Sequence, residues 1–169
     1  MLSDHNWAKF ELGYITIELT SAFLVADSDG DQLFDDVFVK DANGLPCIPG
    51  ESLAGILRHA IAGPNDPETD DTCRGVFGYQ ARGEGDASKV RISYAHVHDK
   101  NDRPVPFRGA PTDDPVLAAL QAGVGRDHVR IGMTGAVDDR GKFDVRLVPA
   151  GARFTFELAV SGNSPLRLK

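Results

Sequence analysis

Residues 37–58 read VFVKDANGLPCIPGESLAGILR, and this stretch decides the fold. Residues 37–40 are mainly apolar and predict a short strand, and the dipeptide Asn43-Gly44 is typical of a tight turn. Pro46 and Pro49 then keep the backbone extended, because proline fixes its own φ and disfavours a helical residue before it. The first half of the stretch therefore predicts a strand, a turn and an extended segment.

The second half of the stretch predicts a helix over residues 52–63. Its apolar residues recur at helical spacing and form one stripe of Leu53, Ile56, Leu57, Ala60 and Ile61. Gly63-Pro64 is a typical signal for the end of a helix. We expect the apolar stripe to pack on a sheet.

Four other segments have the period or the composition of strands. Residues 11–25 alternate, with Ile15, Ile17 and Leu19 on the expected core face. Residues 89–98 also alternate, so that one face carries Val90, Ile92 and Tyr94 and the other carries Arg91, Ser93 and Ala95. Residues 128–133 and 154–160 are rich in β-forming residues and flank a turn signal at residues 138–141, which predicts a protruding hairpin.

The remaining segments are predicted loops, at residues 27–36, 64–75 and 82–88. Residues 99–126 form a large insertion with a short helix expected at residues 115–121. This order predicts an α+β fold, a ferredoxin-like (RRM-like) antiparallel sheet with helices on one face, the insertion and a thumb-like hairpin. We expect one domain over residues 1–169, truncated at the C-terminus because the chain stops just after a strand.

Composition limits the classes of function. The chain has 169 residues with 18 basic and 25 acidic side chains, a net charge of -7 and a pI near 5.1, unlike a free-standing nucleic-acid binder. A polyanionic partner would need a local patch. No apolar stretch approaches the roughly 20 residues that span a membrane, and no signal peptide is evident, so we expect a cytoplasmic protein without a membrane partner. Cys47 and Cys73 form no CxxC pair, which argues against a disulfide framework or a structural zinc site.

The segment at residues 48–58 places a glycine turn against a helix N-terminus. Free backbone NH groups and the helix dipole can bind a phosphate there, and Ser52 can cap the helix or donate to that phosphate. Arg58 can reach a second phosphate or pair with a surface acid. The spacing is neither that of a P-loop nor that of a GxSxG nucleophile elbow. From the residues alone, helix capping and a solvated arginine are the simpler interpretation.

With its surroundings, this segment resembles the RAMP superfamily of CRISPR effector proteins, which share an IPGSSLKGxxR motif. Further matches are VFG at residues 76–78, KVRISYAHV at residues 89–97, and residues 128–158. The pattern is most similar to the backbone subunit of type III complexes, whose copies line up along a guide RNA and insert thumb hairpins across the guide–target duplex. The resemblance therefore implies guide CRISPR RNA, target RNA and other RAMP subunits as partners.

The resemblance also implies RNA-binding residues. They are Gly50, Ser52, Gly55 and Arg58 around the helix, and Thr134, Arg140 and Lys142 in a thumb at residues 134–142. Alternate hairpin residues share a face, so the last two side chains can approach one phosphate together, although strand solubilisation explains the same charges. The chain departs from the family pattern at Glu51 and Ala54, which replace a serine and a lysine. It also carries Tyr94 and Gly132 where aspartates are usual, and it lacks a C-terminal glycine-rich loop.

The acidic loop at residues 27–36 has three interpretations. Asp27, Asp29 and Asp31 alternate like oxygen ligands of calcium, but the EF-hand template fails at its sixth and twelfth positions, and a solvated loop is the plain alternative. The resemblance implies metal-dependent cleavage of target RNA with Asp35 as the catalytic, Mg2+-binding residue and Asp36 as the fallback. The competing functions are a non-catalytic structural or capping domain of a larger or split effector and, more distantly, a calcium-stabilised binding module.

Two histidines lie on one face of the strand at residues 89–98. His96 and His98 could both reach one metal ion, but no third ligand stands at a recognisable spacing. We therefore interpret them as strand-end side chains that face solvent or RNA.

Overall fold

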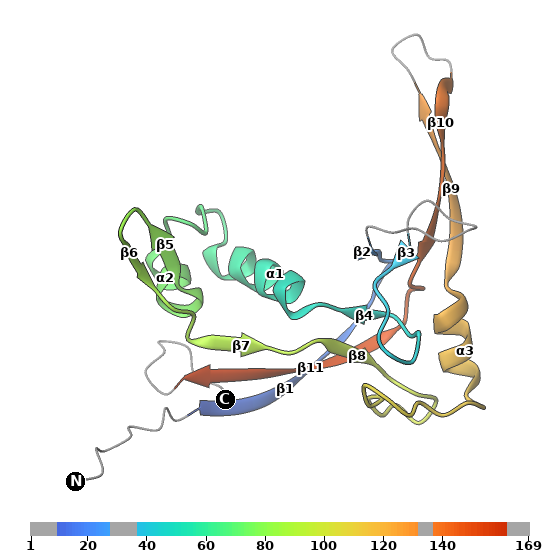
Figure 1. The fold of residues 1–169 in the computed structure, drawn as a ribbon, viewed down its shortest axis with the longest axis horizontal. Coiled ribbons are helices and arrows are strands. Elements are labelled where there is room, and N and C mark those ends of the chain that lie inside the picture. Colours follow the sequence, from blue (N-terminus) through green and yellow to red (C-terminus); the bar gives the residue numbers. More distant parts are fainter. Residues whose placement is uncertain (1–9, 28–36, 132–136, 162–169) are drawn as a thin grey trace. The chain divides into compact units, whose positions relative to one another are not determined.

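The computed structural model describes residues 10–27, 37–131 and 137–161, with the backbone alone at Asp27 and at residues 129–131 and 137–143 (Figure 1). The chain divides into two compact units. The first unit holds residues 10–15, 49–94 and 156–161 of the described chain, and the second holds residues 16–48 and 95–155 apart from the gaps. Strands β1 (Phe10–Glu18) and β11 (Arg153–Ser161) contribute to both units.

The main sheet has the strand order β1-β11-β8-β4, and β7 also pairs with β11. Strands β7 (Val90–Ile92) and β8 (Ala95–Val97) both run antiparallel to β11, and β4 (Cys47–Ile48) runs antiparallel to β8. The predicted α+β class with a mostly antiparallel sheet is confirmed. Along β1 the predicted alternation is also present, with Ile15 and Ile17 half-buried and Tyr14 exposed.

In the first unit, the helix predicted over residues 52–63 is confirmed as α1 (Gly50–Ala62). The expected apolar stripe is only partly correct, because Leu53 is buried whereas Ile56 and Ile61 are 56% and 38% exposed. The reason is that the N-terminal turn of α1 packs against β7 through Gly50, whose Cα lies directly beside the carbonyl of Ile92. Residues 53 and 57 lie on the same helix face as Gly50 and are buried and half-buried, whereas residue 56 lies off that face and is exposed.

Two predicted loops of the first unit are partly wrong. The segment at residues 64–75 contains the start of α2 (Asp71–Phe77), because the Asp70 carboxylate caps the helix by accepting the NH of Cys73 at 2.9 Å. The glycine-rich segment at residues 82–88 belongs to a hairpin of β5 (Tyr79–Ala81) and β6 (Glu84–Asp86). A carboxylate cap and a two-residue turn are short signals that were hidden within polar sequence.

The predicted strand at residues 89–98 is interrupted between β7 and β8. Between the pairs Leu158↔Ile92 and Thr155↔His96, one strand has three residues and the other has two, which is a β-bulge. The Ser93 hydroxyl fixes it by accepting the NH of Glu157 at 2.9 Å and donating to the carbonyl of Tyr94 at 2.8 Å. The extra residue reverses the predicted faces beyond it, so Tyr94 is 45% exposed and Ala95 is buried.

In the second unit, β2 (Ala26–Asp27) pairs with β3 (Val37–Phe38), which confirms a short strand within residues 37–40. The turn at Asn43-Gly44 is confirmed, since Gly44 has a φ of 75° and donates to the carbonyl of Asp41. The insertion at residues 99–126 includes the expected short helix, α3 (Pro115–Ala122), which the Asp114 carboxylate caps by accepting the NH groups of Val116 and Leu117.

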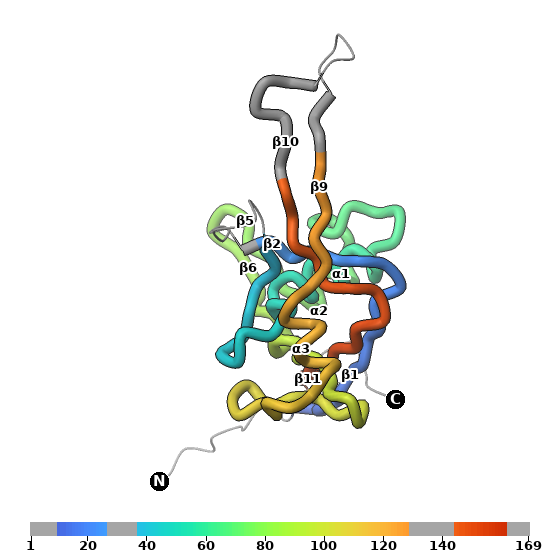
Figure 2. The backbone as a smooth tube through the Cα atoms, turned by 90° about the vertical axis from the view of Figure 1, so that its right-hand side faces the viewer, coloured from blue at the N-terminus to red at the C-terminus, as the bar shows by residue number. Residues whose placement is uncertain are grey.

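A hairpin follows α3 and consists of β9 (Val124–Ile131) and β10 (Val137–Leu147) (Figures 1 and 2). Residues 132–136, which join the strands, lie outside the described residues. The turn expected at residues 138–141 is wrong, because these residues belong to β10. Between the pairs Val137↔Ile131 and Lys142↔Val129, β10 has these four residues where β9 has one. The Asp-Asp-Arg-Gly signal therefore produces an irregularity within the strand.

The core of each unit is aliphatic and aromatic. Phe38 and Phe154 are almost fully buried in the second unit, as are Val76 and Val160 in the first. Within the described ranges, no helix has both the length and the apolar character needed to cross a bilayer.

Candidate functional site

A groove of about 440 Å³ runs along α1 in the first unit. Its helical wall is one face of α1, and β7 and the end of α2 supply the other wall. The lining residues are Gly50, Glu51, Ala54, Gly55, Arg58, Phe77, Ser88, Val90 and Ile92. The groove therefore contains three of the four residues that the sequence predicted around this helix; Ser52 is half-buried and does not line it.

The N-terminus of α1 has no side-chain cap. Its N-cap residue is Pro49, whose carbonyl accepts the NH of Leu53 at 3.2 Å and whose side chain has no acceptor. Ser52 therefore does not cap the helix, contrary to one of the two roles considered for it. The NH groups of an uncapped first turn and the positive end of the helix dipole can attract an anion, so the phosphate-binding role considered for this segment stays a prediction.

The two glycines of this helix have different surroundings. A Cβ on Gly50 would lie 2.2 Å from the carbonyl oxygen of Ile92, so glycine is required there for α1 to approach β7. A Cβ on Gly55 would meet nothing within 4 Å. Gly50 thus has a packing role, and Gly55 leaves the wall of the groove open.

Arg58 lies at the far end of the groove and is half-buried. One of its terminal nitrogens donates to the carbonyl of Pro67 at 3.3 Å, and its Nε is buried without a hydrogen-bond partner within the described ranges. Among the described residues it forms no ion pair with the surface acids that the sequence offered as alternative partners. Its guanidinium is therefore held in place without being neutralised.

The other predicted site residues are not described at side-chain level. Asp35, Asp36 and Thr134 lie outside the described residues. Arg140 and Lys142 belong to β10, where the backbone alone is described. Within the described ranges, no group of three or more His, Cys, Asp or Glu side chains could hold a metal ion.

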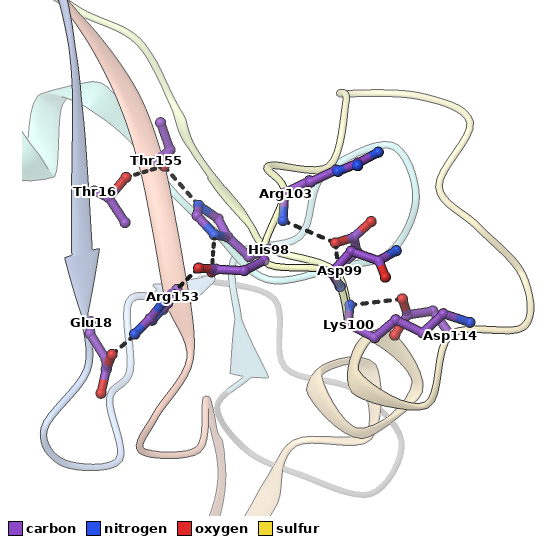
Figure 3. Close-up of polar contacts among 11 residues, drawn as sticks. Thr16, Glu18, His98, Asp99, Lys100, Arg103, Asp114, Arg153 and Thr155 are labelled. Atoms are coloured by element: carbon purple, nitrogen blue, oxygen red, sulfur yellow. Dashed lines mark hydrogen bonds and ion pairs between the residues drawn. The ribbon is translucent and has the colours of Figure 1, made fainter.

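A polar network lies on the exposed face of the sheet in the second unit (Figure 3). His98 is its centre and is only 8% exposed, which corrects the prediction that this side chain faces solvent or RNA. Its Nδ1 lies 2.7 Å from the carboxylate of Asp102, and its Nε2 lies 2.7 Å from the hydroxyl of Thr155, which in turn lies 2.7 Å from the hydroxyl of Thr16. Both ring nitrogens are thus satisfied.

Arg153 extends this network toward the edge strand β1. Its Nε donates to Glu18 at 2.8 Å and one terminal nitrogen donates to Asp102 at 2.7 Å. The hydrogen bond from His98, followed by the charge of Arg153, holds the pKa of the Asp102 carboxyl below its usual value. Asp102 also has a positive φ of 59°, so its backbone is held in an unusual conformation by these contacts.

The network was not foreseen from the sequence. Its members come from two strands and a loop, and Asp102 sits in a turn whose own hydrogen bond runs from its NH to the carbonyl of Asp99. The neighbouring His96 is half-buried, and its ring contacts Phe107 edge-on at 6.0 Å between centroids. The histidine pair thus splits into one side chain in a hydrogen-bond network and one in an aromatic contact.

Both cysteines are buried free thiols. Burial, followed by the charge of Asp41, raises the pKa of Cys47 to about 11. Burial also raises the pKa of Cys73, whose thiol donates to the carbonyl of Arg58 at 3.2 Å. Neither thiol is activated as a nucleophile.

A family model of the RAMP superfamily matches residues 16–164. The chain belongs to the RAMP superfamily. No curated protein matches it.

Solved structures agree with the RAMP fold. A chain of the type III-B Cmr-beta complex in its apo state is similar with a TM-score of 0.65 at 13% identity, over 89% of this chain and 84% of that chain. The same complex bound to cognate target RNA gives a TM-score of 0.66 at 12% identity and the same coverage. A chain of a type IV-B CRISPR complex gives 0.52 at 16% identity, over 89% and 73%. At these low sequence identities, the similarity to the solved structures shows a shared fold and nothing more.

Proposed function

We propose that this RAMP protein is a guide-RNA-binding backbone subunit of a type III CRISPR ribonucleoprotein. Its membership of the superfamily and its fold are consistent with an effector subunit. The observation that carries the proposal is the groove along α1, where an uncapped helix N-terminus lies on one wall together with Arg58, which has no ion pair among the described residues. Both features attract phosphates, and neither reads bases.

The spacing of the two features suits an extended polyanion. From the first turn at Ser52 to Arg58 the helix rises about 9 Å, so one strand of RNA along the groove would place different phosphates at the two ends. Gly55 lies between them and adds no side chain of its own to the wall. Glu51 also lines the groove and opposes phosphate, so we expect each subunit to hold RNA weakly.

The net charge of -7 makes assembly part of the proposal. A chain with this charge binds a polyanion poorly by itself, whereas many copies with one local contact each bind tightly through effective concentration. The partners we propose are guide CRISPR RNA, target RNA and other RAMP subunits, in the cytoplasm. The thumb residues Thr134, Arg140 and Lys142 remain proposed contacts of this assembly.

The test is purification of the assembled complex from its native host, followed by sequencing of the bound RNA. We expect Arg58→Ala to reduce the amount of guide RNA per complex for all guides alike, because a phosphate contact positions without reading sequence. The matched control is Arg82→Ala, an exposed arginine in the β5–β6 turn that lies outside the groove. Guide loss that depends on sequence, or equal loss in the control, would contradict the proposal.

Cleavage of target RNA is a second, separate proposal for Asp35, with Asp36 as the alternative. The two acids come just before β3 in the sequence. Val37 and Phe38 of β3 are 5% and 1% exposed, so the residues that follow the acids are fixed in the core. A carboxylate near such an anchor can bind Mg2+, which supplies charge stabilisation at a scissile phosphate. RNA binding would use other residues.

The assay for cleavage compares Asp35→Asn, Asp36→Asn and the parent complex on a guide-complementary RNA, with Mg2+ and with a chelator. We expect Asp35→Asn to abolish cleavage and leave target binding nearly unchanged. Loss in Asp36→Asn alone would move the site by one residue. Cleavage retained in both variants would leave the non-catalytic structural or capping function.

A further inference from the structure

A second groove of about 310 Å³ lies in the first unit and shares Arg58 with the first groove. It is formed by α1, the loop before α2, α2 itself and β5. Its lining residues are Arg58, Glu68, Arg74, Tyr79, Gln80 and Ala81. Two arginines from different helices therefore share one small concave surface that the sequence did not reveal.

Neither arginine of this groove is neutralised by an ion pair in the described part of the chain. Arg58 is anchored only through the carbonyl of Pro67, and its buried Nε lacks a partner there. The guanidinium of Arg74 stacks over the ring of Tyr79 at 3.8 Å from the centroid. Stacking fixes the plane of a guanidinium and leaves the NH groups at its edge available for hydrogen bonds.

The chemistry of the groove fits a phosphodiester. A planar guanidinium donates two parallel hydrogen bonds to phosphate oxygens, and stacking on an aromatic ring lowers the entropy cost of that geometry. The two arginines carry the positive charge of the groove, and phosphate is the group of RNA that attracts such charge.

We propose that the groove between α1, α2 and β5 holds a backbone phosphate of single-stranded RNA between Arg58 and Arg74. The identity of the ligand rests on the function proposed above. Arg58 then serves two grooves at once, and Arg74 is an RNA contact that the family motif does not include. The contact is independent of base sequence.

Glu68 limits the strength of this contact. Its exposed carboxylate lines the same groove and repels phosphate, but it forms no ion pair with either arginine among the described residues. An exposed glutamate can turn toward solvent, at the cost of weaker binding. The inference therefore requires opposite effects from neutralising Arg74 and neutralising Glu68.

The experiment measures binding of a fluorescein-labelled oligouridine to the full chain by anisotropy, over a series of salt concentrations starting at low salt. We expect Arg74→Gln to weaken binding about threefold to tenfold and to reduce the slope of log K against log salt by about 0.7, the value for one lost phosphate contact on a single strand. Glu68→Gln should tighten binding, and oligoadenosine should give the same changes. Arg82→Gln, which alters an equal charge outside the groove, is the matched control.

Several outcomes would overturn the inference. They are an unchanged salt slope in Arg74→Gln, an equal loss in Arg82→Gln, and no measurable binding of oligouridine. Inorganic phosphate is the second probe: if it perturbs the NMR signals of Arg74 while Arg74→Gln leaves RNA affinity unchanged, the groove binds free phosphate instead of RNA. Thermal unfolding of each variant excludes a folding defect. The proposed function is tested separately, by the amount of guide RNA that copurifies with the Arg58→Ala complex.

Discussion

Arginine side chains have opposite surroundings on the sheet face of the second unit and in the grooves of the first unit. On the sheet face, Arg153 bonds to two carboxylates, and His98 satisfies both of its ring nitrogens. In the grooves, Arg58 and Arg74 have no carboxylate partner within the described ranges. Paired charges stabilise local structure, whereas unpaired arginines remain available to an external anion.

The comparison separates three kinds of variant. Changes on the sheet face should alter stability and leave RNA binding unchanged. Changes of the groove arginines should alter RNA binding and leave stability nearly unchanged, while changes to the scaffold that forms the grooves should alter both.

The largest effect is expected at Gly50, which forms that scaffold. Gly50→Ala should destabilise the protein by about 3 kcal/mol, because a methyl group cannot be accommodated against the backbone carbonyl of Ile92 without moving α1. The matched control is Gly55→Ala, which should stabilise it by about 0.5–1 kcal/mol, since its Cβ meets nothing and alanine favours a helix. Urea unfolding measures both, and equal effects would refute the different roles of the two glycines.

A smaller effect is expected at His98. His98→Ala should cost about 2 kcal/mol of stability, because it removes a buried side chain and leaves the hydroxyl of Thr155 with one partner fewer. RNA binding should not change. His59→Ala, at an exposed position of α1, should change stability by less than about 0.5 kcal/mol. A loss of RNA affinity in His98→Ala would end the contrast between the two regions.

The arginine of the network should matter less than the histidine. Arg153→Gln should lower Tm by less than His98→Ala does, because its side chain and both partner carboxylates are about half exposed to water, where ion pairs contribute little. Its effect on oligouridine binding should be no greater than that of Arg82→Gln. If Arg153→Gln weakened RNA binding as much as Arg74→Gln, charge in general, and not the groove, would control affinity.

The smallest effect concerns pH. The folded-state pKa of Asp102 is depressed below its usual 3.8, chiefly by the hydrogen bond from His98. Its stabilising contribution is therefore complete above pH 3.8 and is lost as pH falls from there through the folded-state pKa. Acid unfolding followed by circular dichroism should show a shallower loss in Asp102→Asn than in the parent below that pH. Identical acid transitions would remove Asp102 from the groups that set acid stability.

Sequence reasoning worked best where the signal was local. The helix expected over residues 52–63, the turn at Asn43-Gly44 and the short α3 all depend on a few adjacent residues, and each is confirmed, although α1 begins two residues earlier than expected. The alternation along β1 was also readable, because a strand with one exposed face has a simple period of two.

The errors arose where distant residues decide the outcome. The bulge beside Tyr94 depends on a hydrogen bond from Glu157, which is 64 residues away in the chain. Burial of His98 depends on Thr155, 57 residues away. Arg74 and Tyr79 meet through the packing of α2 on β5, and no spacing rule predicts that contact. The family motif identified Arg58 but could not show that it borders two grooves.

The buried thiols have a practical consequence for chemical labelling. Cys47 and Cys73 are 4% and 0% exposed, and both have raised pKa values, so near neutral pH neither offers an accessible thiolate to a maleimide dye. A single cysteine introduced at Arg82 or at another exposed position would therefore be modified selectively, with both native residues left in place. Fluorescent reporters can thus be attached close to either groove without first rebuilding the core.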